Sequence, residues 1–308
     1  MPFKNVSQPR RVASVDGVVE SGSYNKKLNA VAMISNNPVQ VAVVGQNGSP
    51  ARVFGVQLDD VSDIALLSRD MAVVRSENQV WQLLDIAHKA KVDPLTTDVR
   101  SIVGPVGDAA LALKWDNSIE QLTPGKNEVS SRSASLRGDH RAVDVGETEC
   151  YAVVDDSGGE FRIHPGATPE QGSTAKVALP AGTKNLDRLR GGKFLSALYQ
   201  RNNPDVCLLR RAGNRLEPKL VRLDVPVTDL VVVETSMIAV AKDGRVILYD
   251  SDAIEKATSR IDAKHEMSLG CHGEPRCCLV AHGHLFVGTS AGEVMLAVIV
   301  RKQGGVSI

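Results

Sequence analysis

The chain repeats one order of apolar and polar segments. In each copy an apolar strand is followed by a short polar break, a second apolar strand, a Gly, Asn or Asp turn, and a strand in which apolar and polar residues alternate. The clearest copies occupy Val61–Ile86 and Val227–Ile254. Runs such as Leu230–Val233 are apolar on both faces, which is typical of a strand packed between neighbouring sheets. Third strands alternate, as in Glu160–His164, and this indicates a strand closer to solvent.

The spacing of the copies favours a ring of similar sheets. The first residue after each hairpin turn marks the register: Val53, Val80, Ile119, Phe161, Val206, Val246 and Val294. Five of the six intervals lie between 39 and 48 residues, and the first interval is 27. Seven units in 308 residues correspond to 44 residues each, close to the roughly 40–45 residues of a four-stranded propeller blade. The predicted units of this single domain (1–308) are 28–56, 61–86, 101–125, 141–166, 188–213, 227–254 and 276–300.

We therefore expect an all-β protein, a seven-bladed β-propeller of four-stranded antiparallel blades. Radial repetition lets each sheet bury both faces against its neighbours, whereas an open ring would expose sheet edges. The stretch Arg11–Val19 precedes the first unit and has the pattern of a strand without a partner. It is predicted to complete the last blade and so to close the ring. A two-sheet β-sandwich is the alternative fold.

One unit resembles the end of a WD40 blade. Lys242–Asp250 (KDGRVILYD) is similar to the pattern Asp-Gly-x-[Ile/Val]-x-Leu-Trp-Asp of that family, and Val80–Asp85 (VWQLLD) is a looser echo. The family's Gly-His pair does not recur at regular spacing, and no unit contains a Trp-Asp pair. The resemblance implies a WD40-like propeller in shape, without the family's signature.

Polar segments separate the units. Thr123–Asp139 and Pro165–Thr183 are rich in Ser, Gly and charged residues, and are predicted to be outer loops. Ser251–Ser268 begins with Ser-Asp before Ala-Ile-Glu-Lys-Ala. That order is typical of a helix N-cap with an acidic first turn, so it predicts a short surface helix.

Composition narrows the class of protein. Lys+Arg and Asp+Glu number 36 each, so no net charge draws the chain to nucleic acid or to an anionic membrane. The longest apolar runs are far shorter than the roughly 20 residues of a membrane-spanning helix, and MPFKNVSQPRR lacks the apolar segment of a secretory signal. Five cysteines, with Cys277 and Cys278 adjacent, argue against a disulfide framework. We expect a cytoplasmic protein of a reducing compartment.

Cysteine and histidine are concentrated in Cys271–His284, which holds three of the five cysteines and three of the seven histidines. The predicted strand 277–281 rises about 3.3 Å per residue, so Cys271 and His272 lie too far from His282 and His284 to share one zinc ion. Buried thiols with a His-Gly-His turn are the favoured interpretation, and a metal site is the alternative. We expect no metal and no other cofactor.

Three aspartates lie 17 residues before the register mark of their units: Asp63, Asp144 and Asp229. Carboxylates at one height near the ring axis would form an acidic mouth for a cation or a basic peptide. The favoured alternative is that each aspartate caps the loop entering its inner strand by accepting backbone N–H groups.

Charge is uneven along the chain. Asp144–Glu160 contains six acids and no Lys or Arg, whereas Lys184–Arg222 contains ten bases and three acids. Solvated strand faces explain most such runs, and a docking patch for an acidic protein partner is the functional alternative. Nucleic acid is less favoured as a partner because the basic stretch has few aromatic residues for stacking. Since arginine binds carboxylates in a bidentate manner, the candidate partner-binding residues are Arg188, Arg190, Arg210 and Arg211.

No linear enzyme signature occurs in the chain: it has no nucleophile elbow, phosphate loop, His-Glu-x-x-His or dinucleotide-binding glycine motif. We expect a non-catalytic scaffold or adaptor that docks a protein partner on a propeller face or rim, monomeric alone or as a subunit of a larger assembly. Propeller enzymes assemble catalytic groups from several blades. The alternative function is therefore a hydrolase or lyase with an acidic, metal-dependent site at the channel mouth, around Asp63, Asp144 and Asp229.

Overall fold

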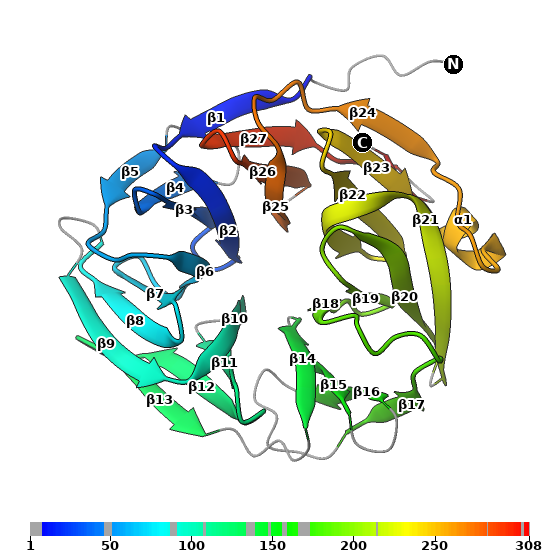
Figure 1. Cartoon of the computed structure of the whole chain (residues 1–308), viewed down its shortest axis with the longest axis horizontal. Coiled ribbons are helices and arrows are strands. Elements are labelled where there is room, and N and C mark those ends of the chain that lie inside the picture. The colour runs from blue at the N-terminus through cyan, green and yellow to red at the C-terminus, as the bar shows by residue number, and fades with distance from the viewer. Residues whose placement is uncertain are drawn as a thin grey trace.

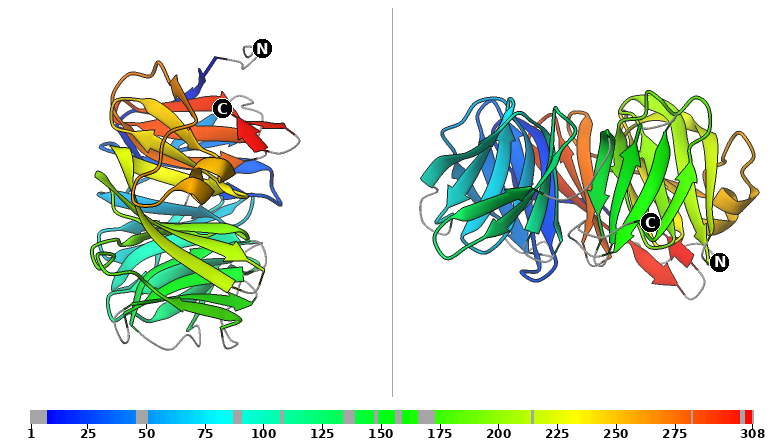
Figure 2. Two further views of the ribbon diagram at one scale, coloured as in Figure 1. Left: turned by 90° about the vertical axis from the view of Figure 1, so that its right-hand side faces the viewer. Right: turned by 90° about the horizontal axis from the view of Figure 1, so that it is seen from below.

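The sheets of this protein surround a central axis, as a computed structural model of the chain shows (Figure 1). The structure describes residues 8–45, 51–86, 91–106, 109–133, 139–146, 149–155, 159–165, 173–213, 215–281, 283–302 and 305–307. Side views show a ring that is thinner along its axis than across it (Figure 2). The all-β prediction is confirmed, and the four-stranded antiparallel sheets are consistent with a β-propeller.

Four consecutive sheets have four strands each, paired in chain order. The first contains β2 (Val18–Asn25), β3 (Ala30–Asn36), β4 (Gln40–Gly45) and β5 (Arg52–Gly55). The second contains β6 (Val61–Leu66), β7 (Met71–Ser76), β8 (Gln79–Leu84) and β9 (Lys91–Thr97). The third contains β10 (Val99–Val106), β11 (Ala109–Lys114), β12 (Ile119–Pro124) and β13 (Val129–Ser133). The fourth contains β14 (His140–Val145), β15 (Glu149–Val154), β16 (Glu160–Pro165) and β17 (Ala175–Ala178).

A seven-stranded sheet follows, so the described residues form six large sheets rather than seven separate ones. It contains β18 (Arg188–Arg190), β19 (Leu195–Tyr199), β20 (Asn203–Ala212), β21 (Arg215–Val233), β22 (Ser236–Ala241), β23 (Arg245–Tyr249) and β24 (His265–Ser268). The sheet is continuous because β21 is long, and it pairs with β20 in its first part and with β22 in its second. The prediction of seven separate sheets left residues 214–226 between two units, because Pro218 and Pro226 argue against a continuous strand there.

The last large sheet joins the two ends of the described chain. Its strands are β25 (Pro275–Ala281), β26 (His284–Thr289), β27 (Glu293–Val298) and β1 (Arg10–Ser14). Strand β1 pairs antiparallel with β27. The sequence segment Arg11–Val19 is thus divided at Gly17: its first part lies in this sheet and its second part begins β2. A separate hairpin pairs β28 (Val300–Lys302) with β29 (Gly305–Ser307).

The apolar core is divided among clusters between neighbouring sheets. Ala32 and Ile34 of β3, for example, pack with Ile64 and Leu66 of β6, and all four are buried. This explains why the inner and second strands are apolar on both faces. The first sheet begins at Val18, ten residues before the predicted unit 28–56. The prediction missed β2 because Glu, Ser, Gly and Asn interrupt its apolar residues.

The predicted surface helix is confirmed as α1 (Ser251–Lys256), the single helix among the described residues. Asp250 is its N-cap, and its side chain accepts a hydrogen bond from the Ala253 backbone N–H at 2.9 Å. No helix in the described part of the chain has the length and apolar character needed to cross a membrane.

Candidate functional site

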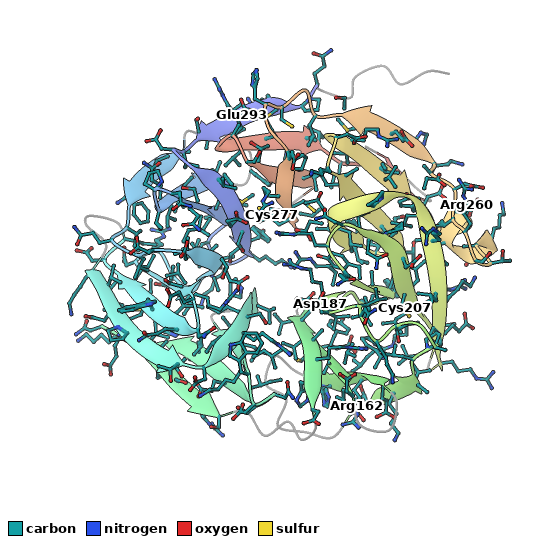
Figure 3. The ribbon with its side chains drawn as sticks, in the orientation of Figure 1. Arg162, Asp187, Cys207, Arg260, Cys277 and Glu293 are labelled. Atoms are coloured by element: carbon teal, nitrogen blue, oxygen red, sulfur yellow. The ribbon has the colours of Figure 1, made fainter. Side chains whose placement is uncertain are left out.

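The inner strands enclose a cavity of about 540 Å³ on the axis of the ring. Volumes of roughly 300–1,000 Å³ are typical of small-molecule sites. All six cationic residues that line it are arginines: Arg75, Arg100, Arg141, Arg188, Arg190 and Arg201. Five acids line it as well: Glu20, Asp63, Asp144, Asp187 and Asp229. Asp187 and Cys277 lie toward the centre of the ring, whereas Arg162, Arg260 and Glu293 lie toward its outside (Figure 3).

A β-bulge near the start of the inner strands supplies many of these charges. The bulge leaves one residue out of the ladder in β2, β6, β10, β14, β21 and β25, because the register shifts there. Bulges re-aim side chains and are common next to functional sites. The unpaired residues are Glu20, Ser62, Arg100, Arg141, Thr228 and Arg276. In β18 the corresponding residue is Asp187, which donates its N–H to the Tyr199 carbonyl beside the Arg188–Tyr199 pair.

Contacts between these residues place them at one end of the channel. The Arg276 guanidinium donates to both carboxylate oxygens of Glu20, at 3.1 and 3.2 Å. Arg100 donates to the carbonyl oxygens of His140 and Arg141, at 2.8 and 2.7 Å. Each arginine therefore reaches from its own bulge to the start of the next inner strand. We call this end of the channel, defined by the bulge residues, the bulge mouth.

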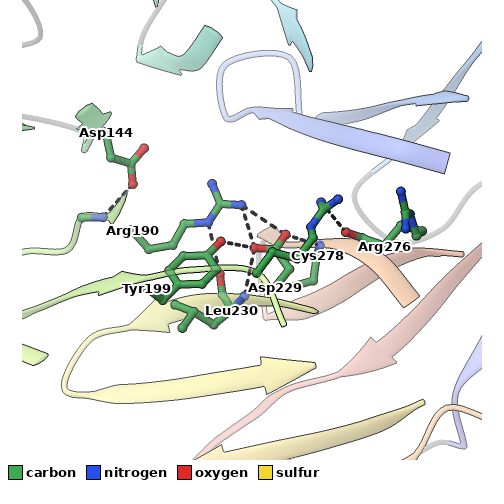
Figure 4. A network of polar contacts seen from close by, with 9 residues as sticks. Asp144, Arg190, Tyr199, Asp229, Leu230, Arg276 and Cys278 are labelled. Atoms are coloured by element: carbon green, nitrogen blue, oxygen red, sulfur yellow. Dashed lines mark hydrogen bonds and ion pairs between the residues drawn. The ribbon is translucent and has the colours of Figure 1, made fainter. Parts of the chain in front are cut away.

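Asp229 is the most heavily bonded carboxylate of the channel (Figure 4). Arg190 donates to its two oxygens at 3.1 and 3.2 Å, and the Tyr199 hydroxyl also donates to it. The Cys278 backbone N–H donates to it at 2.8 Å, which joins three inner strands through one side chain. Burial opposes the charge of Asp229, but the Arg190 guanidinium and these hydrogen bonds outweigh burial and hold its pKa below the usual range.

Asp144 has a different environment from Asp229. It accepts a backbone hydrogen bond from Gly191 at 2.6 Å, and the Val145 N–H also favours its charged form. Burial raises the pKa of Asp144, and the Arg190 charge and the Gly191 N–H offset this only in part. Asp144 lies two residues beyond Ala142, the residue that follows the β14 bulge, whereas Asp63 and Asp229 directly follow their bulges. The three predicted aspartates thus line one cavity but do not share one height.

The predicted capping role needs a correction. Asp144 and Asp229 do accept backbone N–H groups, but Gly191 follows β18, Cys278 lies in β25, and Leu230 lies within β21 itself, so none of these donors belongs to a loop that enters the aspartate's own strand. Asp63 instead accepts from the Arg75 guanidinium at 2.7 Å. The spacing of 17 residues fails for Asp144 because the connection between β15 and β16 is longer than its counterparts: Phe161 pairs with Val153, and Val153 pairs with Ala142 instead of Asp144.

The four predicted partner-binding arginines do not lie together. Arg190 is bonded to Asp229 inside the channel. Arg210 pairs with Glu255 of α1 at 2.9 Å, and Arg211 pairs with Glu149 of β15 at 2.7 Å. Arg188 is exposed to the channel and makes no hydrogen bond or ion pair with any described residue. Three of the four charges are therefore used within the chain.

The acidic and basic runs partly neutralise each other across neighbouring sheets. Glu149, from the acidic run, binds Arg211, from the basic run. Glu160 binds Arg162 at 2.6 Å on its own strand. Two other acids of the run, Glu147 and Asp156, lie outside the described residues.

The Cys271–His284 segment does not bring metal ligands together. Cys277 and Cys278 are buried in β25, and the His272 ring lies 3.1 Å from the Glu293 carboxylate. His282 lies outside the described residues. Among the residues that the structure describes, no group of three His, Cys, Asp or Glu side chains is placed to hold a metal ion.

Trp115 was not singled out by the sequence analysis, although its side chain lines the cavity. It lies in the turn between β11 and β12 and is 56% exposed. The Arg100 guanidinium lies 6.0 Å from its ring centroid, within reach of a cation–π contact. One sequence signal would have identified the bulges. A charged residue directly follows the first residue of an apolar strand, as in Val99-Arg100 and Pro275-Arg276.

Comparison with known proteins places the chain by fold alone. No protein-family model matches the chain, and no curated protein matches its sequence. The computationally designed Ika8 protein is similar in structure, with a TM-score of 0.56 and 12% identity over 94% of this chain and 99% of that one. BamB from Moraxella catarrhalis, a β-propeller, has a TM-score of 0.56 and 13% identity over 92% of this chain and 86% of that one. These similarities support a propeller-like fold and do not single out the WD40 family.

Proposed function

We propose that this chain is a non-catalytic protein-interaction module that docks a partner protein at the bulge mouth. The observation that supports this most is the pairing there of an exposed aromatic ring, Trp115, with cationic side chains in an open cavity. Trp and Arg are the residues enriched in the energetic centres of protein interfaces. The bulge mouth thus offers the chemistry of a binding surface on a rigid ring.

In this proposal the ring has seven blades. The seven-stranded sheet is treated as two blades that share β21, since β21 pairs with β20 up to Arg222 and with β22 from Val227. Strand β1 supplies the fourth strand of the last blade through its pairs with β27. A ring closed in this way holds the bulge residues of all blades at fixed positions, and this reduces the entropy lost on binding.

The partner surface that fits the bulge mouth is acidic. Arg188 has no counterion among the described residues, whereas Arg190, Arg210 and Arg211 each have one. Docking on Arg188, Arg100 and Trp115 is therefore favoured over docking on the original set of four arginines. An unpaired guanidinium gains a bidentate bond to a carboxylate without breaking an internal pair.

Site-specific crosslinking tests this proposal. A photoreactive benzoylphenylalanine replaces either Trp115 or Phe194, which lies in the turn between β18 and β19 with Lys193 5.3 Å from its ring centroid. That turn is at the other end of the inner strand β18 from its bulge residue, so Phe194 is a matched aromatic control. We expect a partner to crosslink from position 115 and not from 194.

Binding of the crosslinked partner is then measured with purified variants. Trp115→Ala and Arg188→Gln are each expected to weaken it at least about tenfold, and Arg210→Gln to leave it unchanged. Crosslinking from position 194 alone, or equal affinity for Arg188→Gln and the unmodified protein, would contradict docking at the bulge mouth.

A second proposal is a hydrolase or lyase with its site in the channel. It is favoured by one observation: Asp144 faces the cavity and its pKa is raised by burial, as suits a general acid. Calcium and zinc titrations by calorimetry separate the proposals. Stoichiometric micromolar binding that Asp144→Asn abolishes would favour the enzyme, and no binding is expected for the interaction module.

A further inference from the structure

Three arginines come together on one side of the channel. Arg188 belongs to β18, Arg201 follows β19, and Arg276 is the bulge residue of β25. The Arg201 guanidinium donates to the Arg276 carbonyl oxygen at 2.9 Å. Burial lowers the pKa of Arg201, and the charges of Arg188 and Arg276 lower it further, as expected for cations held close together.

Three carboxylates around these arginines are engaged with other donors, whereas a fourth, Asp187, lies beside Arg188 in the chain and lines the same cavity. Glu20 receives both of its bonds from Arg276. Asp229 accepts from Arg190, Tyr199 and the Cys278 backbone, and Asp63 accepts from Arg75. The group therefore holds three positive charges, while only Arg276 has a carboxylate of its own.

Donor groups of the same arginines lack partners. The Nε atoms of Arg201 and Arg276 are buried and have no hydrogen-bond partner among the described residues. Arg188 is exposed to the cavity and has no partner either. Arg141 also has buried Nε and Nη2 atoms without a partner among the described residues, although its Nη1 donates to the Lys184 carbonyl oxygen at 2.7 Å. Arg188 differs from all of these arginines because its whole guanidinium is without a partner in the described part of the chain, so a ligand takes up its donors without breaking an internal bond.

We propose that this side of the channel is an oxyanion site, in which Arg188 directly binds a phosphate or carboxylate group of a small molecule. Its planar guanidinium offers two parallel N–H donors to such a group. Arg201, which lines the same cavity, and Arg276, whose carbonyl oxygen accepts from Arg201, supply supporting positive charge. The site concerns a small ligand inside the channel and does not depend on the protein partner proposed above.

The geometry also limits what binds. The cavity of about 540 Å³ admits a small organic anion as well as an inorganic one. Asp187 is the neighbour of Arg188 in the chain, and its charge acts on Arg100. Asp63 and Asp229 also act on Arg188, so a ligand of high negative charge density is opposed by carboxylates on several sides. A single oxyanion group fits this balance better than a polyphosphate.

Calorimetry at low ionic strength tests the site with two probes, inorganic phosphate and succinate. At least one probe is expected to bind saturably with a stoichiometry of one, and the tighter probe identifies phosphate or carboxylate as the group recognised. Arg188→Gln is expected to weaken binding at least about tenfold, since it removes a charge-assisted bidentate contact. Arg188→Lys keeps the positive charge but loses the two parallel N–H donors. Its affinity for the probe is expected to lie between those of the unmodified protein and Arg188→Gln.

The control is Arg210→Gln, which removes an arginine paired with Glu255 outside the cavity lining and is expected to leave binding unchanged. Thermal melts of each variant at equal chloride concentration show that it is folded, and stabilisation by the probe gives a second measure of binding. The proposal is overturned if neither probe binds at up to about 10 mM, near the weak limit of useful affinity, or if Arg188→Gln binds as tightly as the unmodified protein.

Discussion

At the scale of single residues, two aspartates in one cavity have opposite energetics. Asp229 is charged and held by Arg190, Tyr199 and the Cys278 N–H. Asp144 has only the backbone N–H groups of Gly191 and Val145 as donors, and burial raises its pKa. The charge of Asp229 therefore stabilises the folded state, whereas the charge of Asp144 costs free energy.

The variants Asp229→Asn and Asp144→Asn are expected to change the free energy of unfolding in different directions. Asp229→Asn leaves Arg190 without its carboxylate, and should cost about 3 kcal/mol of unfolding free energy at pH 7. Asp144→Asn keeps an oxygen for the Gly191 N–H and removes a buried charge, so it should be neutral or stabilising by up to about 1 kcal/mol. Urea unfolding of both variants checks this.

The pH dependence separates the two aspartates further. The pKa of Asp229 is lowered by folding, so its stabilising contribution is present above about pH 4 and is lost as the pH falls through its folded pKa. The pKa of Asp144 is raised, so the unmodified protein loses stability as the pH rises from about 4 through that folded pKa, and Asp144→Asn does not. If both variants lost the same free energy of unfolding at every pH, these directions of the two pKa shifts would be contradicted.

At the scale of the elements, a glycine controls how β1 meets β27. Gly292, in the turn between β26 and β27, has φ +78°, and a Cβ there would overlap the Val15 carbonyl oxygen. Val15 donates its N–H to the Gly292 carbonyl at 2.9 Å. The turn thus requires glycine both for its backbone conformation and for the close approach of the N-terminal chain.

Gly292→Ala is expected to destabilise the protein more than Gly244→Ala. Gly244 occupies the corresponding turn between β22 and β23 with φ +84°, but a Cβ there would meet only the Cys271 sulfur at 3.7 Å. Both variants have the same backbone strain, of about 1 kcal/mol, so the difference between their melting temperatures isolates the contact with Val15. Equal melting temperatures would show that this contact contributes nothing to stability.

In the molecule as a whole, β1 and β27, which lie far apart in the sequence, pair in one sheet. Ala13 and Val15 are buried in one cluster with Phe286 and Leu296. The same cluster contains Cys277, whose pKa burial raises to about 12. Its thiol is therefore unreactive while the cluster is intact.

Removal of residues 1–16 is expected to lower the melting temperature by about 5–10 °C, because it removes buried apolar side chains and leaves an unpaired sheet edge at β27. Thiol labelling followed by mass spectrometry should then modify Cys277 as well as the half-buried Cys271. Light scattering should show association of the truncated protein. Removal of residues 1–7 alone, which keeps Arg10–Ser14, is the control. An unchanged melting temperature, monomeric state and labelling pattern would contradict closure by β1.

Local sequence patterns were sufficient to predict the inner strands of most units, their period and the short helix. Alternation and turn residues are local properties, so Val227–Ile254 could be identified as a strand unit without any knowledge of its neighbours. Asp250 likewise caps α1 through a residue only three positions away. The all-β class and the antiparallel order of the sheets follow from such short-range patterns.

Which charges face the channel and which are paired depends on residues far apart in the chain and could not be predicted from local patterns. The connection between β15 and β16 is longer than its counterparts in the other sheets, so a fixed sequence spacing could not place Asp144 relative to Asp63 and Asp229. Arg211 meets Glu149 across two sheets, 62 positions apart in the chain. Sequence composition showed that the arginines were numerous, but whether each one has a counterion is set by residues from other blades. Arg188 is left without one because Asp229, the buried acid whose charge acts on it, is already bonded to Arg190 and Tyr199.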